Sequence, residues 1–218
     1  DFLIISGAYG DTRRYRSLHL YEQLRLLGLS ASIHQITDVG LVERAAKAKM
    51  VVIHRATYEQ NVAAIIAAGK ANNAVVLADM DDLIFDPQML PYIDVADLKD
   101  PIRYEAYRMN MDEHKQTLLN CDGVLVTTKF LADEITKMGK TTWVHRNAAD
   151  SYMVDASEKA LKTKPGQSEK VIIGYASGSP THNKDLESIA GAAAAVMKAH
   201  ENTELWLIGP VAVPEALT

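Results

Sequence analysis

The chain has 218 residues, of which 48% are hydrophobic and 23% are charged, and its formal net charge is -5. These values predict a soluble globular protein with a core large enough for one domain, or for one domain and part of another. The acidic balance argues against general nucleic-acid binding, and no apolar run approaches the length of a membrane span. The single cysteine, Cys121, cannot form an internal disulfide, which fits a reducing compartment. We therefore predict a cytoplasmic protein; peripheral contact with a membrane stays open.

The chain begins with a predicted strand, a glycine-containing turn and a helix. Residues 2–6 are apolar, Gly7 and Gly10 follow, and leucines recur at helical spacing over residues 12–27. Three arginines crowd the first helical turn, where a cation is disfavoured by up to about 1 kcal/mol. These are Arg13, Arg14 and Arg16. The conflict favours an anion bound at this turn; the alternative is that the arginines reach solvent or a neighbouring carboxylate.

Apolar strands then alternate with helices. The predicted strands are residues 30–35, 50–53 and 74–78, and the predicted helices are residues 41–48 and 60–68, the second stopped by Gly69. This alternation predicts an α/β fold in which a Rossmann-like parallel sheet carries helices on both faces. Ligands bind such sheets outside the carboxyl ends of the strands. Polar residues stand at three of those ends (residues 7–10, 54–55 and 79–82), so we expect them to converge on one edge of the sheet.

Three aspartates directly follow the strand at residues 74–78. They are Asp79, Asp81 and Asp82. The spacing resembles that of haloacid dehalogenase-like phosphatases, in which the first aspartate is the nucleophile and the second the general acid, and also the Asp-x-Asp metal site of other glycosyltransferases. The phosphatase interpretation needs a later acidic pair to hold magnesium, and no convincing pair stands at a later strand end. The carboxylates could still bind a cation or form a solvated loop, and we predict no metal site.

The middle of the chain extends the same alternation. Residues 87–101 are rich in loop-forming residues, and His114, on the long helix that follows, is expected at the polar surface. The later predicted elements are a helix at 102–119, a strand at 121–128, a helix at 130–138 ended by Gly139, and a strand at 142–145. The polar segment at 151–169 is typical of a linker.

A second strand, loop and helix begin after this segment. An apolar strand at residues 171–173 leads into a loop of small residues, an alanine-rich helix at 186–199 and a strand at 204–208. Glycine lets backbone N–H groups approach an anion, and a helix N-terminus adds partial positive charge. Gly178 and Lys184 therefore predict a diphosphate site. The alternative is that these residues serve only the turn.

The motifs between residues 121 and 150 resemble the retaining glycosyltransferases of the GT-B fold, in the large family-four group. Members of that group read Ala-Asp-x-Val, an apolar strand, Ser, a helix, Gly, a strand and Asn-Gly-x-Asp. This sequence has Cys121-Asp122-Gly123-Val124, then Thr127 or Thr128, Gly139, and Asn147-Ala148-Ala149-Asp150. The arginine cluster after Gly10 resembles the first glycine loop of the group, and the loop before Lys184 resembles the start of its donor-binding domain.

The resemblance implies an acceptor-side domain at residues 1–150, a linker at 151–169 and the first part of a donor-side domain at 170–218. It implies transfer of a hexose from a UDP- or GDP-linked sugar to a glycan, lipid-linked or small-molecule acceptor, with retention, in polysaccharide biosynthesis. No metal or other cofactor is expected, because helix N-termini, backbone amides and a lysine supply the positive charge that the leaving diphosphate needs.

The same resemblance assigns residues to three roles. Asp81 takes the catalytic position, although many members carry histidine there. The donor diphosphate would be held by Gly178, Ser179, His182, Asn183 and Lys184, although the arginine that many members have in this loop is absent. The acceptor cleft would be lined by Gly7, Gly10, Arg13, Arg14, Arg55 and Asp82. A further departure is Ala148, where many members have glycine.

The paired glutamates that hold the donor in this group have no counterpart before Thr218. We therefore expect a longer parent protein, and little or no transferase activity from this chain alone. Two alternatives stay open. One is a magnesium-dependent phosphohydrolase that uses Asp79 and Asp81, and the other is a non-catalytic nucleotide-binding module of a multidomain glycan-synthesis protein.

Overall fold

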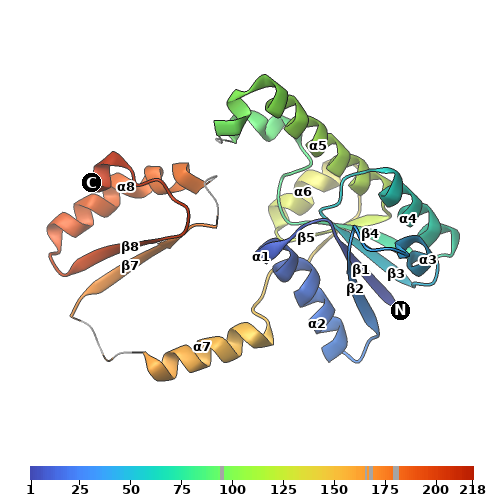
Figure 1. The fold of residues 1–218 in the computed structure, drawn as a ribbon, viewed down its shortest axis with the longest axis horizontal. Helices are drawn as coiled ribbons and strands as arrows, with labels where there is room; N and C mark the ends of the chain where they lie inside the picture. Colours follow the sequence, from blue (N-terminus) through green and yellow to red (C-terminus); the bar gives the residue numbers. More distant parts are fainter. Residues whose placement is uncertain (94–95, 165, 167–168, 179–181) are drawn as a thin grey trace. The chain divides into compact units, whose positions relative to one another are not determined.

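The computed structural model describes residues 1–93, 96–164, 166, 169–178 and 182–218 (Figure 1). The chain divides into two units. The first unit contains residues 1–90 and 105–158, and the second contains residues 91–104 and 159–218. No helix in the described part of the chain is long and apolar enough to span a membrane.

The first unit contains a six-stranded parallel sheet with the strand order β2-β1-β3-β4-β5-β6. Its strands are β1 (Phe2–Ser6), β2 (Ala31–Gln35), β3 (Met50–His54), β4 (Val75–Met80), β5 (Gly123–Val126) and β6 (Thr142–Val144). The register places Ser6 beside His54, and His54 beside Asp79. Three polar residues therefore lie side by side where neighbouring strands end.

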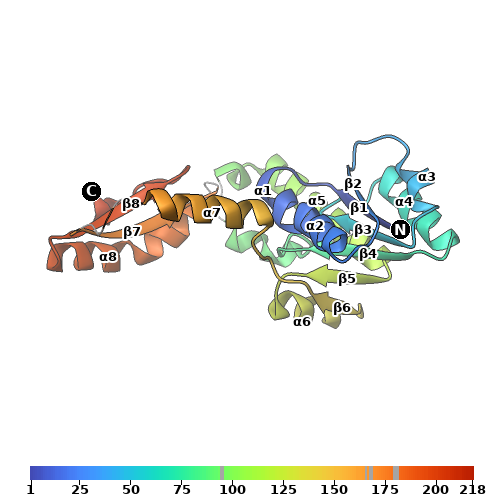
Figure 2. The ribbon, with the colours of Figure 1, turned by 90° about the horizontal axis from the view of Figure 1, so that it is seen from below.

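Helices cover both faces of this sheet, as the alternating sequence pattern predicts. The helices of this unit are α1 (Gly10–Arg13), α2 (His19–Leu26), α3 (Leu41–Ala45), α4 (Gln60–Ala71), α5 (Pro101–Asn120) and α6 (Lys129–Lys137). Helix α7 (Ser151–Thr163) has no buried residue and continues into the second unit. Leu3 and Ile5 share one apolar core with α3, α4 and α6. Ile4 points to the opposite face and is also fully buried, and Figures 1 and 2 show α2 on the face opposite α4. The predicted doubly covered sheet is confirmed.

The first helix differs from the predicted continuous helix over residues 12–27. A π-helical segment, Arg14–Leu18, separates α1 from α2. The wider turn places Arg16 and Ser17 in buried positions. Single π-helical turns inside helices occur frequently at functional sites, and this one directs Arg16 to Asp79 at the carboxyl edge of the sheet.

The strand order reverses at β1. The chain passes from β1 to β2 on one side and then returns to β3 on the other side. In open parallel sheets the crevice outside such a switch point is the usual place for a ligand, because the loops leave in opposite directions there. The switch point here is flanked by Gly7 and Arg55, which directly follow β1 and β3.

In the second unit, β7 (Val171–Ala176) pairs in parallel with β8 (Thr203–Ile208), and α8 (Asn183–Ala199) connects them. Leu186 and Ala190 of α8 are buried, whereas Trp206 on β8 is 52% exposed. Short 3-10 turns lie at Ala96–Lys99 and Glu215–Leu217 in this unit, and a further one, Pro87–Tyr92, spans the boundary with the first unit. The predicted order of strand, loop, helix and strand is present.

The predicted helix end at Gly69 differs from the structure. Gly69 does not end its helix, because α4 continues to Ala71. Its lack of a side chain serves packing instead, since a Cβ atom there would lie 2.9 Å from the Val76 side chain on β4. The segment predicted as a linker contains helix α7 over most of its length.

Candidate functional site

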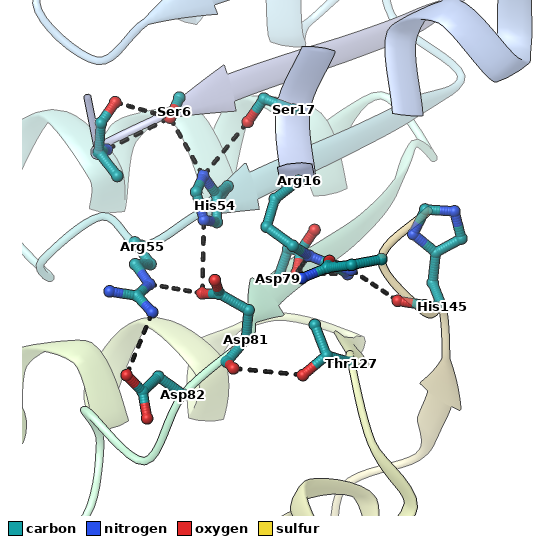
Figure 3. Close-up of polar contacts among 12 residues, drawn as sticks. Ser6, Arg16, Ser17, His54, Arg55, Asp79, Asp81, Asp82, Thr127 and His145 are labelled. Carbon is teal, nitrogen blue, oxygen red and sulfur yellow. Dashed lines mark hydrogen bonds and ion pairs between the residues drawn. The ribbon is translucent and has the colours of Figure 1, made fainter. Parts of the chain in front are cut away.

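Polar side chains from several elements meet at the carboxyl edge of the first sheet, as predicted. Figure 3 shows Ser6, His54 and Asp79 at the strand ends, with Arg16 reaching them from the π-helical segment and Arg55 facing Asp81. Each side chain belongs to an element of the first unit. The cluster thus consists of two ion pairs and a histidine between them.

Arg16 and Asp79 form a buried ion pair. The Arg16 Nε and Nη2 atoms lie 3.0 and 2.9 Å from Asp79 Oδ1, and the two side chains are 0% and 1% exposed. Burial raises the pKa of Asp79, and the positive charge of Arg16 opposes that increase. Arg16 Nη1 also donates to the carbonyl oxygen of His145 at 2.6 Å and to Asn147 Oδ1 at 3.0 Å. Arg16 therefore connects β4 to the loop after β6.

His54 connects the two serines to the second ion pair. Its Nδ1 atom lies 3.1 Å from Ser6 Oγ and 3.2 Å from Ser17 Oγ, and its Nε2 atom lies 3.6 Å from Asp81 Oδ1. Ser6, Ser17 and His54 are all buried. A serine nucleophile has to reach a substrate carbonyl. These hydroxyl groups therefore position the imidazole ring and do not form an accessible catalytic triad.

Arg55 holds both aspartates that follow β4. Its Nε atom donates to Asp81 Oδ1 at 2.5 Å, and its Nη2 atom lies 3.4 Å from Asp82 Oδ2. Burial raises the pKa of Asp81, but hydrogen bonding and charge from His54 and Arg55 outweigh it and lower the value to about 2. Asp81 is therefore ionised at neutral pH, which suits a hydrogen-bond acceptor and does not suit a general acid.

The Arg55 backbone adopts an unusual conformation. Its φ angle is 43°, in the left-handed region that non-glycine residues seldom occupy. Gly7 packs directly against this residue and donates its N–H to the carbonyl oxygen of His54 at 2.7 Å. Such strained residues cluster at functional sites, where the surrounding packing holds them. The strain here lies at the switch point of the sheet.

The loop after β6 is fixed by the first helix. His19 Nε2 lies 3.0 Å from Asp150 Oδ2, and Asp150 Oδ1 accepts the Met153 N–H at 2.7 Å, which caps α7. The hydrogen bond from Met153 lowers the pKa of Asp150, and His19 adds to this effect. The stretch Asn147-Ala148-Ala149-Asp150 is thus anchored at its two ends, by Arg16 and by His19.

A cavity of about 560 Å³ lies beside the switch point. Its wall includes Gly7, Arg55, Asn61 and His114, contributed by the ends of β1 and β3 and by helices α4 and α5. The expectation that His114 lies at the polar surface is wrong, because its side chain is 7% exposed and lines this cavity. The helical pattern of α5 could not distinguish a surface histidine from one beneath a neighbouring loop.

His114 should make stability depend on pH. Burial lowers the pKa of His114, and the charge of Arg55 adds to this effect, so the value falls from 6.5 to about 4. The unfolded chain then binds more protons between these pH values, and the stabilising contribution present above pH 6.5 is lost as pH falls through about 4. The shift corresponds to about 3 kcal/mol.

Urea unfolding across this pH range would measure the effect. We expect His114→Gln to flatten the decline in unfolding free energy, while His200→Gln, at an exposed position, should leave the slope unchanged. Equal slopes for the parent protein and His114→Gln would contradict the assigned shift.

The glycine loop of the second unit is described in part. Ser179 lies outside the described residues. The Tyr175 hydroxyl donates to the carbonyl oxygen of His182 at 3.0 Å, and His182 Nδ1 lies 2.9 Å from Asp185 Oδ2. Asn183 Oδ1 accepts the Ala212 N–H at 2.9 Å, so its carboxamide connects the start of α8 to the segment after β8.

The residues predicted for the acceptor cleft fall into two groups. Gly7, Arg55 and Asp82 lie at the carboxyl edge, where Gly7 and Arg55 also line the cavity. Gly10 begins α1 with a φ of 63°, Arg13 is partly buried, and the Arg14 guanidinium lies 5.4 Å from the centre of the Tyr152 ring. Predicting the arginines as one cluster missed that Arg16 alone among them is fully buried.

The sequence analysis also missed the roles of Ser6, Ser17 and His54. The register of three parallel strands brings Ser6 and His54 together, and the π-helical turn adds Ser17. The sequence did contain one signal for His54, because this residue directly follows the apolar strand at residues 50–53. Within the described parts of the chain, no group of three or more His, Cys, Asp or Glu side chains could hold a metal ion.

No protein-family model matches the chain, and no curated protein matches it. Some solved structures do match the chain. One is S. aureus MnaA in complex with UDP, at 14% identity and a TM-score of 0.44, covering 99% of this chain and 63% of that chain. Another is described as a UDP-N-acetylglucosamine 2-epimerase from Listeria monocytogenes, at 14% identity and a TM-score of 0.45, with the same coverages. The chain thus spans 63% of the length of these two proteins.

Proposed function

We propose that the chain is the acceptor-side domain and the beginning of the donor-side domain of a retaining glycosyltransferase that uses a UDP- or GDP-linked hexose. The observation that carries this proposal is the strained Gly7–Arg55 contact beside a cavity at the switch point of a doubly covered parallel sheet. This is the place where open α/β sheets bind their ligands. The acceptor would be a glycan, a lipid-linked sugar or a small molecule, and the enzyme would act in the cytoplasm.

The acceptor would bind to the first unit, and the donor would bind to the second unit. In the first unit, ionised Asp81 is held by Arg55 and His54 and is 12% exposed, so it can accept a hydrogen bond from an acceptor hydroxyl group. In the second unit, α8 has 17 residues and begins at Asn183, directly after the glycine loop. Its N-terminus and Lys184 would stabilise the charge of the leaving diphosphate.

The phosphohydrolase alternative fits the geometry less well. It requires Asp79 to attack a phosphate, but Oδ1 of Asp79 is held by Arg16 and the side chain is 1% exposed. A nucleophile has to be accessible to the reacting atom. The second alternative, a module that binds nucleotide without turnover, would share the donor-loop chemistry and differs only in the absence of transfer.

Calorimetric titration with UDP and with GDP, each with and without magnesium, tests the donor assignment. We expect one nucleotide to bind without magnesium, and Lys184→Ala to weaken the binding by about tenfold, which corresponds to loss of one charge-assisted hydrogen bond. Lys198→Ala is the matched control, because Lys198 is exposed and lies in the last turn of the same helix.

Two results would contradict the transferase. One is the absence of binding by either nucleotide, both to this chain and to a parent chain extended through the donor-side domain. The other is magnesium-dependent hydrolysis of a generic phosphate ester that Asp79→Asn abolishes, which would establish the phosphohydrolase instead.

A further inference from the structure

His54 is a buried histidine whose two ring nitrogens face different partners (Figure 3). Nδ1 lies 3.1 Å from Ser6 Oγ and 3.2 Å from Ser17 Oγ, and Nε2 lies 3.6 Å from Asp81 Oδ1. The His54 side chain is 0% exposed, so bulk water reaches neither nitrogen. In a neutral imidazole one nitrogen donates a hydrogen bond and the other accepts one. The partners of Nδ1 therefore decide which nitrogen carries the proton.

The Ser6 hydroxyl group already has a hydrogen-bond acceptor in its own loop. It donates to the carbonyl oxygen of Ala8 at 3.0 Å, and its oxygen accepts the Ala8 N–H at 3.2 Å. A hydroxyl group carries a single proton, so Ser6 cannot donate to Ala8 and to His54 at the same time. Ser6 therefore closes the turn after β1 and leaves Nδ1 of His54 to another donor.

Ser17 is in the position to be that donor. The residue is 1% exposed, and His54 Nδ1 is the only hydrogen-bond partner of its hydroxyl group within the described part of the chain. A buried hydroxyl proton without an acceptor leaves the full cost of its desolvation uncompensated. Donation from Ser17 to Nδ1 avoids this cost and leaves the ring proton on Nε2. The opposite tautomer would deprive the Ser17 proton of its acceptor and turn the lone pair of Nε2 toward a carboxylate.

The proton on Nε2 then faces Asp81. At 3.6 Å the contact with Oδ1 is longer than a hydrogen bond, but the N–H dipole still stabilises the negative charge of the carboxylate. Arg55 Nε donates to the same oxygen at 2.5 Å. The other oxygen, Oδ2, accepts no hydrogen bond from a described residue, and the Asp81 side chain is 12% exposed. Two groups thus hold Oδ1, and Oδ2 is left to accept a hydrogen bond from a ligand.

From these partners we propose that Ser17 holds His54 in the tautomer with its proton on Nε2, and that His54 is thereby a positioning residue for Asp81. The π-helical segment Arg14–Leu18 supplies the serine, so this turn contributes to the site through the orientation of a ring as well as through an ion pair. The use of Oδ2 to accept a hydrogen bond from an acceptor hydroxyl group rests on the proposed function, but the placement of the proton does not.

Long-range proton–nitrogen correlation NMR on the isotope-labelled chain distinguishes the two tautomers, and through-bond assignment from the backbone identifies the His54 ring among the seven histidines. At about pH 8, where free imidazole is neutral, we expect the proton on Nε2. Ser17→Ala should shift the equilibrium about tenfold toward the Nδ1–H tautomer, the usual effect of losing one buried hydrogen bond. Ser6→Ala is the matched control, because Ser6 is as close to Nδ1 but donates elsewhere, and it should leave the tautomer unchanged.

A substitution of Asp81 tests the other end of the same contact. Asp81→Asn removes the charge that repels a lone pair on Nε2, and its amide group can donate to that nitrogen. We therefore expect this variant, too, to shift the equilibrium toward the Nδ1–H tautomer. Asp133→Asn, at an exposed position of α6, is the control and should give the His54 signals of the parent protein.

Three results would overturn the proposal. They are an Nδ1–H tautomer or an imidazolium ring in the parent protein, a shift in Ser6→Ala as large as that in Ser17→Ala, and parent-like His54 signals in both Ser17→Ala and Asp81→Asn. Titration of the same sample with UDP and GDP separates this proposal from the proposed function. Absence of nucleotide binding with the proton on Nε2 removes the donor assignment alone, whereas nucleotide binding with the proton on Nδ1 removes only the positioning role of His54.

Discussion

Replacing Arg16 by methionine should lower the free energy of unfolding of the first unit by about 3–5 kcal/mol, the usual result of removing one partner of a buried ion pair. The Arg16 and Asp79 side chains are 0% and 1% exposed, so neither solvent nor rearrangement can replace the lost charge. The substitution also removes the donor to the His145 carbonyl oxygen and to Asn147. Urea unfolding followed by circular dichroism would measure the change, with the midpoint as the readout.

The pH dependence and a second substitution identify the cause. Without Arg16, burial raises the pKa of Asp79 and only the charge of His54 opposes the increase, so the carboxyl group is more readily protonated in the folded state and the deficit should shrink at low pH. Arg16→Met combined with Asp79→Leu should be more stable than Arg16→Met alone, because no buried carboxylate is left. Arg25→Met is the control at an exposed position of α2. A double variant no more stable than the single variant would show that the ion pair is not the reason for the loss.

The fold could be predicted from the sequence because its signals are local. Strands buried on both faces read as continuous apolar runs, such as residues 50–53, and alternate with helices at short range. The order of these elements predicts a parallel sheet, and a parallel sheet directs all of its strand ends to one edge. That is why the polar residues at 7–10, 54–55 and 79–82 could be expected to converge.

The interior of the site could not be predicted in the same way, because it depends on register and on irregular backbone. The Ser6–His54–Asp79 row follows from an alignment of three strands that no local pattern specifies. Arg16 is buried, in contrast to Arg13 and Arg14, because a π-helical turn rotates it toward β4. The loop before α8 lies partly outside the described residues. Its role in binding the donor therefore stays a prediction.

Gly7→Ala should destabilise the first unit by about 3 kcal/mol or more, at the upper end of the cost of overpacking. A Cβ atom at this position would overlap the carbonyl oxygen of Arg55 and lie 2.7 Å from the Ala56 Cα atom. Both contacts are with backbone, which cannot rotate away as a side chain can. The Arg55 backbone is already strained, with a φ of 43°, so relieving the overlap would shift the residue that holds Asp81.

Gly10→Ala is the control. It distinguishes the destabilisation caused by the close contact at Gly7 from the destabilisation that follows from replacing any glycine of positive φ. Gly10 has a φ of 63° but no atom within 4 Å of the position that its Cβ would take, so only the backbone penalty of about 1–2 kcal/mol applies. Thermal and urea unfolding of both variants would compare the two costs. If Gly7→Ala is as stable as Gly10→Ala, the β1 and β3 ends do not need their close approach. If it is markedly less stable, the close approach of the β1 and β3 ends is needed to form the switch point.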